Sequence, residues 1–176
     1  MKKVLLPTDL SVQSLWAAKQ MIQETRYQSA LTIYIVHMIE MPSSINDLLS
    51  LGRNRKYPSM SSAFVDALQI LRNKATASNI HVHFEYVYGN NARVLKNFMQ
   101  GQAITEVLLM DGYQYCFNQN VSVDFIPFLK KTNTRINNMP FNIGNFSEFQ
   151  LLSILLSNGT EENNEEVVLY TSALAV

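Results

Sequence analysis

The sequence predicts an α/β fold built on a mainly parallel sheet. Short apolar runs, typical of strands that are buried on both faces, recur along the chain. Each run is followed by a stretch whose apolar residues repeat at helical spacing, so that strands and helices alternate. The connections between such parallel strands are expected to be right-handed.

The first strand and helix lie at the start of the sequence. Residues 4–6 are apolar and Pro7 follows them, which predicts a short buried strand. Ser11 is expected to cap the next helix, because a serine side chain accepts a hydrogen bond from the first free amides of a helix. This helix is expected to turn Leu15 and Ile22, with Ala18 and Met21, toward the core.

The second strand leads into a long connection. Residues 30–40, ALTIYIVHMIE, are apolar and β-branched, which predicts another buried strand. Residues 41–60 contain proline, serine and glycine and indicate an irregular loop. The basic residues of this loop could meet an anion, a nucleic acid or the acidic C-terminal tail, but they lack interleaved aromatic residues, so a solvated loop is favoured. They are Arg53, Arg55 and Lys56.

The central part of the chain continues the alternation. Residues 60–77 predict a helix. Residues 80–88 alternate between apolar and polar side chains, which indicates a strand with one wet face, as at the edge of a sheet. We expect a helix over 91–100, a buried strand within 105–112 and a fourth helix over 123–131.

The pattern weakens after Arg135. Residues 136–148 are too polar, and too interrupted by proline, to predict a good buried strand. Residues 149–159 indicate a helix that ends at an Asn-Gly pair, and 165–176 could form a terminal strand. We therefore divide the chain into an α/β domain, 1–136, and a C-terminal extension, 137–176, that packs on the domain or on a partner subunit.

Composition excludes several classes of protein. The 176 residues are 47% hydrophobic and 16% charged, which is typical of one globular domain. A single cysteine, Cys116, excludes a disulfide framework within the chain. The basic start resembles a signal peptide but has no apolar run of sufficient length, and no run is long enough to span a membrane. A cytoplasmic protein with no membrane partner is expected.

The formal net charge of zero conceals an asymmetry. Residues up to Arg135 carry 14 basic and 9 acidic side chains, and the rest carry none and 5. This difference could reflect weak self-association or a masked surface, although solvated faces of a globular protein are favoured.

The opening of the chain resembles the universal stress protein family. The resemblance lies in VLLPTDLSVQSLWAAKQMI and in LTIYIVHMIEMP, whose Val36–His37 pair matches the end of the family's second strand. It extends through TEVLLMDG to about Arg135. The resemblance implies a Rossmann-like, three-layer α/β/α fold with five strands in the order 3-2-1-4-5, which places the third strand at an edge.

The same resemblance implies a ligand site, because some members of that family bind ATP. In them the residue matching Asp9 lies near the adenine and ribose, and the residue matching Val36 lies beside the adenine. Open α/β sheets bind ligands outside the carboxyl ends of their strands. For Asp9, a role in bracing the turn is an equal alternative. The candidate ligand-binding residues are Pro7, Thr8, Asp9, Val36, His37, Met110, Asp111 and Gly112.

The phosphate-binding part of the family motif is missing. ATP-binding members hold the phosphates with a glycine-rich loop after the fourth strand, since the backbone must approach the phosphates closely. Here Gly112 is followed by no glycine before Gly144. Asp111 adds negative charge, and bulky Tyr113, Tyr115 and Phe117 stand in the loop. We therefore expect a degenerate member of the family with no cofactor, ATP being disfavoured.

No catalytic or metal-binding constellation emerges from the other residues. His81 and His83 share one strand face but lack a third ligand at zinc-like spacing, which favours simple exposure. His37 is expected to be a satisfied strand-end residue, and Cys116 has no evident base. We expect no catalytic residues, no metal and no enzyme activity.

Two functions remain open. The favoured one is a non-catalytic domain that acts in stress response or regulation through protein contacts, as a homodimer with an unknown protein partner and no nucleic acid. Residues 167–173 would then pair with a sheet edge or cross to the partner. The alternative is a protein that binds ATP, AMP or another small molecule in a rebuilt pocket. In that case Tyr113 and Tyr115 would stack on the ligand.

Overall fold

The computed structural model describes residues 2–25, 30–41, 44, 58–117, 121–141 and 147–156 of the chain. Its sheet has five strands in the order β3-β2-β1-β4-β5, and every neighbouring pair is parallel. The strands are β1 (Lys2–Pro7), β2 (Leu31–Ile39), β3 (Ile80–Tyr88), β4 (Glu106–Asp111) and β5 (Arg135–Pro140). The observed strand order confirms the expected α/β fold class.

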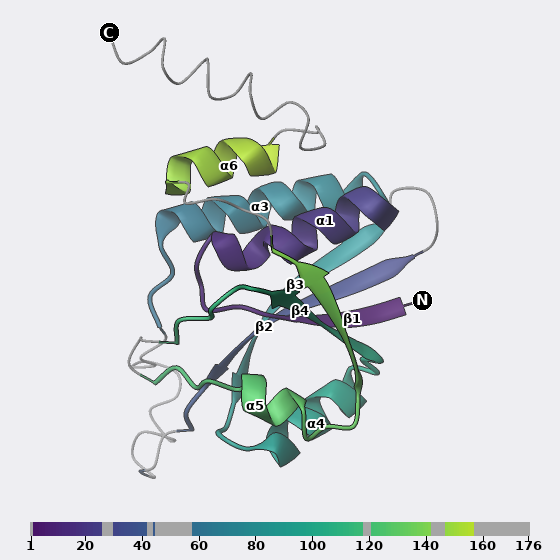
Figure 1. Ribbon diagram of the computed structural model, residues 1–176, viewed down its shortest axis with the longest axis vertical. Helices are drawn as coiled ribbons and strands as arrows, with labels where there is room; N and C mark the ends of the chain where they lie inside the picture. The colour runs from purple at the N-terminus through teal and green to yellow at the C-terminus, as the bar shows by residue number, and fades with distance from the viewer. Residues whose placement is uncertain are drawn as a thin grey trace, which may run out of the picture.

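Helices cover both faces of the sheet, which gives the three layers (Figure 1). One face carries α1, α3 and α6, and the other carries α4 and α5. A short 3-10 turn, Gln13–Leu15, precedes α1. The helices are α1 (Trp16–Thr25), α3 (Ser62–Thr76), α4 (Ala92–Gly101), α5 (Ile126–Leu129) and α6 (Glu148–Leu156).

Two apolar cores follow from the period of two along the strands. Val4 and Leu6 of β1 point toward α1 and α3, whereas Leu5 between them points toward α4 and α5. All nine residues of β2 are buried, because this strand is central and covered on both faces. The central strands of the sheet are therefore buried on both faces, and its polar residues concentrate at its edges and strand ends.

The edge position of β3 is confirmed. Its polar side chains, His81, His83 and Glu85, are exposed, whereas Ile80 and Val87 are buried. The α3 helix before it begins after Ser61, whose hydroxyl accepts a hydrogen bond from the Phe64 amide at 3.1 Å.

The fifth strand follows Arg135, as the expected order of five strands requires, and it is half-exposed and not a buried strand. Residues 135–140 form this strand, β5, so the expected division of the chain after residue 136 falls inside it. The strand tolerates polar residues because it lies at an edge and is half-exposed, and Pro140 is its last residue, where a missing amide does least harm.

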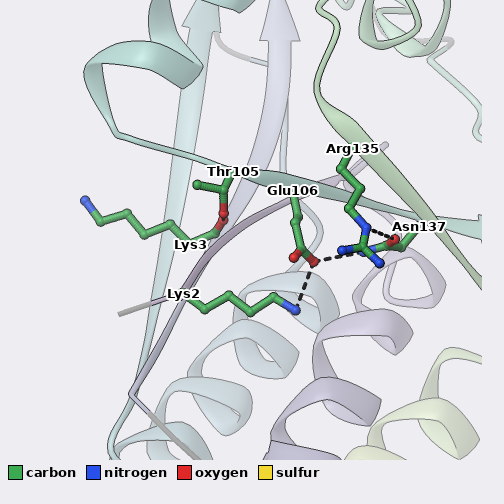
Figure 2. A network of polar contacts seen from close by, with 6 residues as sticks. All are labelled: Lys2, Lys3, Thr105, Glu106, Arg135 and Asn137. Carbon is green, nitrogen blue, oxygen red and sulfur yellow. Dashed lines mark hydrogen bonds and ion pairs between the residues drawn. The ribbon is translucent and has the colours of Figure 1, made fainter.

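A polar network ties β5 to the amino ends of β1 and β4 (Figure 2). The Asn137 side-chain amide donates to Glu106 at 2.8 Å, and the Lys2 ammonium lies 2.9 Å from the same carboxylate oxygen. The hydrogen bond from Lys2 lowers the pKa of Glu106. Arg135 Nε in turn donates to Asn137 Oδ1 at 3.2 Å. The polar residues that make β5 hard to predict from the sequence thus help to hold this strand in the sheet.

The fourth helix is shorter than expected. It covers 126–129 instead of 123–131, because residues 121–123 before it pair with residues 38–40 at the end of β2. The Glu40 amide donates to the Val121 carbonyl at 2.8 Å, and the Val123 amide donates to the Met38 carbonyl at 2.9 Å.

The C-terminal helix is confirmed within the described residues. α6 packs on α3 and buries Leu151, Ile154 and Leu155. The Lys74 ammonium of α3 donates to the last carbonyls of α6, those of Leu155 at 2.5 Å and Leu156 at 2.7 Å. The expected strand at 167–173 and the basic loop residues Arg53, Arg55 and Lys56 lie outside the described residues. None of the described helices is long and apolar enough to cross a bilayer.

Candidate functional site

The candidate site begins where β1 ends. The Thr8 amide still pairs with β2, donating to the Val36 carbonyl at 2.9 Å, and the chain then turns toward α1. The Thr8 hydroxyl accepts a hydrogen bond from the Leu10 amide at 3.0 Å and lies 2.6 Å from the Ser14 hydroxyl. Leu10 adopts a positive φ of 68°, which a bulky residue rarely does. Side-chain hydrogen bonds therefore shape a tight turn between strand and helix.

Asp9 lies at the centre of this turn and is 7% exposed. Its Oδ1 accepts from the Ser11 amide at 3.1 Å and from the Ser11 hydroxyl at 2.7 Å. Its Oδ2 accepts from the Tyr113 hydroxyl at 2.8 Å and from the Cys116 amide at 2.9 Å. Both carboxylate oxygens are thus bound by the chain itself, on one side from the turn and on the other from the loop after β4.

Gly112 directs that loop back over the sheet. Its φ of 81° lies in the region that favours glycine, at the residue where the chain leaves β4. Tyr113 then reaches the turn, where its hydroxyl also lies 2.8 Å from the Ser11 hydroxyl. Burial, followed by the negative charge of Asp9, raises the pKa of Tyr113, so this hydroxyl stays protonated and can donate.

An aromatic row accompanies the loop across the strand ends. The ring centroids of Phe141 and Tyr113 are 4.9 Å apart, those of Tyr113 and Tyr115 are 4.8 Å apart, and those of Tyr115 and Phe117 are 6.1 Å apart. Burial raises the pKa of Tyr115 to about 12. The first two pairs meet edge to face, so these rings are used in packing against one another.

His37 joins the end of β1 to the same loop. Its Nδ1 lies 2.8 Å from the Thr8 carbonyl oxygen, and its Nε2 lies 2.9 Å from the Ser122 hydroxyl. Because a carbonyl can only accept, Nδ1 carries the proton, and the Ser122 hydroxyl donates to Nε2 of the neutral ring. Burial lowers the pKa of His37, which favours this neutral form. Ser122 itself forms an isolated antiparallel bridge with Ile39, beside the part of β2 that extends past β1.

The loop after β4 therefore contacts both Asp9 and His37, at the point where the strand order reverses. Tyr113 and Cys116 bind Asp9, and Ser122 binds His37. In open α/β sheets this is the place where ligands bind. Among the described residues, no three histidine, cysteine, aspartate or glutamate side chains gather as metal ligands would.

Comparison with known proteins gives matches in structure alone. No protein-family model matches the chain, and no curated protein matches it in sequence. A hypothetical protein whose biochemical function was assigned from its structure is 14% identical, with 81% of this chain and 98% of that chain covered and a TM-score of 0.49.

Two further matches carry the name universal stress protein. UspA from Lactobacillus plantarum is 13% identical over 78% of this chain and 97% of its own, with a TM-score of 0.46. A family member from Arabidopsis thaliana with AMP bound is 12% identical over 80% of this chain and 92% of its own, with a TM-score of 0.44. At these identities and TM-scores the matches add nothing to the fold, which the strand order shows by itself. That order, 3-2-1-4-5, is the one that the resemblance in sequence to the universal stress protein family implies.

The fold brings most of the candidate residues together. Pro7, Thr8, Asp9, Val36 and His37 meet at the ends of β1 and β2, where the side chains of Thr8, Asp9 and His37 make hydrogen bonds. Val36 is fully buried.

The β4 residues of the candidate set lie differently. Met110 is buried in the core, and its amide donates a long, 3.5 Å hydrogen bond to the Tyr115 hydroxyl. Asp111 and Gly112 are exposed, and the Asp111 carbonyl accepts from the Phe141 amide at 3.0 Å. They position the loop and make no contact with Asp9 that the structure records.

Sequence reasoning missed Ser122 and the contacts that Cys116 and Tyr113 make with Asp9. Ser122 carries no local motif, and Cys116 acts through its backbone amide, which any residue but proline supplies. The aromatic residues were noticeable in the sequence, but the contact of Tyr113 with Asp9 depends on the tertiary fold.

Proposed function

We propose that this chain is a non-catalytic, universal-stress-protein-like domain that acts in stress response or regulation through protein contacts, as a homodimer, without binding ATP. The observation that supports the proposal is that the chain itself hydrogen-bonds both oxygens of the Asp9 carboxylate. Its oxygens already accept hydrogen bonds from Ser11, Tyr113 and Cys116.

A nucleotide at this site would have to displace these donors. A hydrogen bond to a charged group contributes about 1.5–3 kcal/mol, so releasing Tyr113 and Cys116 together has a substantial cost. A triphosphate also needs several backbone amides aimed at it. The Cys116 amide is aimed at Asp9 instead, and the next glycine after Gly112 is Gly144. Sterics and hydrogen bonding both oppose a polyanion here.

The alternative, a rebuilt pocket in which tyrosines stack on a ligand, receives less support. Tyr113 packs edge to face with both Tyr115 and Phe141, and its hydroxyl is bound to Asp9. A ring ligand would have to separate these contacts. Binding of AMP is therefore the result that would favour this alternative in the test below.

The test combines oligomeric state with ligand binding. We expect light scattering on the full chain, after size exclusion, to give twice the mass of one chain. We expect its melting temperature to stay unchanged with ATP, AMP and cyclic AMP. A monomer at every concentration, together with a dose-dependent rise in melting temperature, would reject the proposal in favour of a small-molecule binder.

A further inference from the structure

Ser122 and His37 form a pair that the proposed function does not use. The Ser122 hydroxyl lies 2.9 Å from Nε2 of His37, and Nδ1 of the same ring lies 2.8 Å from the Thr8 carbonyl oxygen. The ring therefore has one protonated nitrogen that the backbone holds, and one lone pair that is directed at the serine hydroxyl. A nucleophile, a base and a group that orients the base are the parts that activate a serine for acyl transfer.

The surroundings of His37 suit a base. Its side chain is 1% exposed, and burial lowers its pKa, so the ring is neutral and able to accept a proton. The rings of Tyr86 and Phe117 pack against it, with centroids 5.9 Å and 5.8 Å away. When the ring takes up a proton, the Thr8 carbonyl and the negative charge of Asp9 both stabilise the charged form. His37 is therefore neutral at rest and supported when it is protonated during a reaction.

The backbone at half-buried Ser122 leaves an amide available to a reacting carbonyl. Val121 before it adopts a positive φ of 68°, a strained conformation that a β-branched residue rarely has and that is concentrated at functional sites. Ser122 pairs with Ile39 of β2, but the hydrogen bonds of this pairing are made at Val121 and Val123. The Ser122 amide therefore points away from β2, and the described structure records no acceptor for it. In serine nucleophiles this amide donates to the oxyanion that forms on the attacked carbonyl.

We propose that Ser122 is a nucleophile that accepts an acyl group from an activated ester, such as a thioester, with His37 as its general base. The Ser122 Oγ attacks the carbonyl carbon of the ester while its proton passes to Nε2 of His37. The bond between the carbonyl carbon and the leaving group then breaks, and the leaving atom takes the electron pair and the proton of the imidazolium. The products are an acyl ester on Ser122, the free leaving group and a neutral His37.

The reaction is expected to stop at the acyl ester. A water that hydrolysed this ester would have to reach Nε2, because the other ring nitrogen of His37 is bound to the Thr8 carbonyl. The acylated Ser122 side chain lies against Nε2, and the rest of the ring is buried. One acyl group is thus taken up per chain without turnover, which goes beyond the proposed non-catalytic function and agrees with it. Acylation also removes the hydrogen bond from Ser122 to His37, which links the loop after β4 to β2.

The test uses p-nitrophenyl acetate as the acyl donor and mass spectrometry to locate the acetyl group. The full chain carries Cys116→Ala, which removes a competing exposed thiol and keeps the backbone amide. We expect Ser122 to be acetylated at least about a hundred times faster than Ser62, an exposed serine at the start of α3. His37→Gln should slow the reaction at Ser122 at least about a hundredfold, whereas the substitution His81→Gln at an exposed histidine should leave it unchanged.

The pH dependence of acetylation gives a second measurement that needs no change at His37. Because only the neutral ring accepts a proton, the rate at Ser122 should level off above pH 6.5, the ordinary pKa of histidine. The rate at Ser62, which has no base beside it, should keep rising as the hydroxide concentration rises. The titratable groups recorded against the His37 ring are Asp9 and Tyr86.

The outcomes separate this nucleophile from the proposed function. Folding of every variant is checked by its circular dichroism and melting temperature. Equal rates at Ser122 and Ser62, an unchanged rate in His37→Gln, or a rate at Ser122 that rises steadily with pH would overturn the proposal. Continuous release of p-nitrophenolate that Ser122→Ala abolishes would keep the nucleophile but reject both the arrest at the acyl ester and the non-catalytic function. A monomer that binds nucleotide would reject the proposed function and leave the acylation of Ser122 standing.

Discussion

The Tyr113 hydroxyl donates a 2.8 Å hydrogen bond to Asp9, a residue 104 positions earlier in the chain. This contact lies between β1 and β4, at the point where open α/β sheets accommodate ligands. Asp9, which the family resemblance associates with ligand binding, thus braces the chain through its hydrogen bonds. Stability and ligand affinity should both depend on it or on its neighbours.

Removing the Tyr113 hydroxyl should destabilise the protein. For Tyr113→Phe we expect a loss of about 1.5–3 kcal/mol in the free energy of unfolding, because a partly buried hydrogen bond to a carboxylate is lost while the ring remains. Urea denaturation measures it. Tyr115→Phe is the matched control and should cost less than Tyr113→Phe, since the only hydrogen bond recorded for the Tyr115 hydroxyl is the 3.5 Å contact with Met110. Equal losses would contradict the assigned role of Tyr113.

The coupling between Tyr113 and Asp9 can be isolated by a double-mutant cycle. We expect Asp9→Asn and Tyr113→Phe to be strongly non-additive, with a coupling energy of about 1 kcal/mol or more, because the two groups touch directly. The reference cycle pairs Asp9→Asn with Tyr34→Phe, whose hydroxyl bonds Gln102. Additive losses in the first cycle would show that the contact contributes little.

Stability should fall as the pH drops below the usual pKa range of histidine. Burial lowers the pKa of His37, so the unfolded chain takes up the proton first and gains stability relative to the folded chain. The loss begins near pH 6.5 and continues down to the lowered pKa, at no more than about 1.4 kcal/mol per pH unit. Urea denaturation at several pH values measures this slope. His37→Gln should flatten it, while His81→Gln, an exposed control, should leave it unchanged.

The contact between α3 and the end of α6 should stabilise the C-terminal helix. Lys74→Met keeps the apolar stem but removes the donor to the Leu155 and Leu156 carbonyls. We expect a loss of about 1 kcal/mol and faster hydrogen exchange across 148–156. The same substitution at exposed Lys96 of α4 serves as control. Unchanged exchange in α6 would mean that its apolar face alone holds it.

A buried threonine in β2 offers a stabilising change. Thr32 is 3% exposed, and its hydroxyl has no hydrogen-bond partner among the described residues. Thr32→Val removes an unsatisfied polar group at constant shape and should raise the free energy of unfolding by about 1 kcal/mol.

The matched control for this change is Thr132, which is 5% exposed and donates to the Leu129 carbonyl at 2.7 Å. Thr132→Val should therefore lower the free energy of unfolding by about 1 kcal/mol. If thermal or urea denaturation showed that both variants change the free energy of unfolding in the same direction, the difference in hydrogen bonding would not explain these changes.

The sequence predicts elements whose pattern is local and strong. The alternation over 80–88 indicated an edge strand, and β3 has those bounds and that position. The buried runs that became β1, β2 and β4 were equally clear. By contrast, β5 is stabilised by the side-chain network with Glu106 and by a neighbouring strand, neither of which leaves a local pattern.

The candidate site was predicted only in part, for a related reason. Asp9 and His37 lie at strand ends and stand out in the sequence. Their partners come from a loop that is more than eighty residues away, and one of them acts through a backbone amide. Ser11 was expected as a helix cap, and its hydroxyl does accept from the Ser14 amide, but it also binds Asp9 and lies against Tyr113. Multiple roles of this kind follow from tertiary packing.

The most direct test of whether a nucleotide binds at the carboxyl ends of β1 and β4 is a calorimetric titration of the full chain with ATP and Mg²⁺. Since Tyr113 and Cys116 already occupy the Asp9 carboxylate, we predict no saturable heat at millimolar nucleotide. A saturable isotherm with one nucleotide per chain, weakened by Asp9→Asn, would contradict this account.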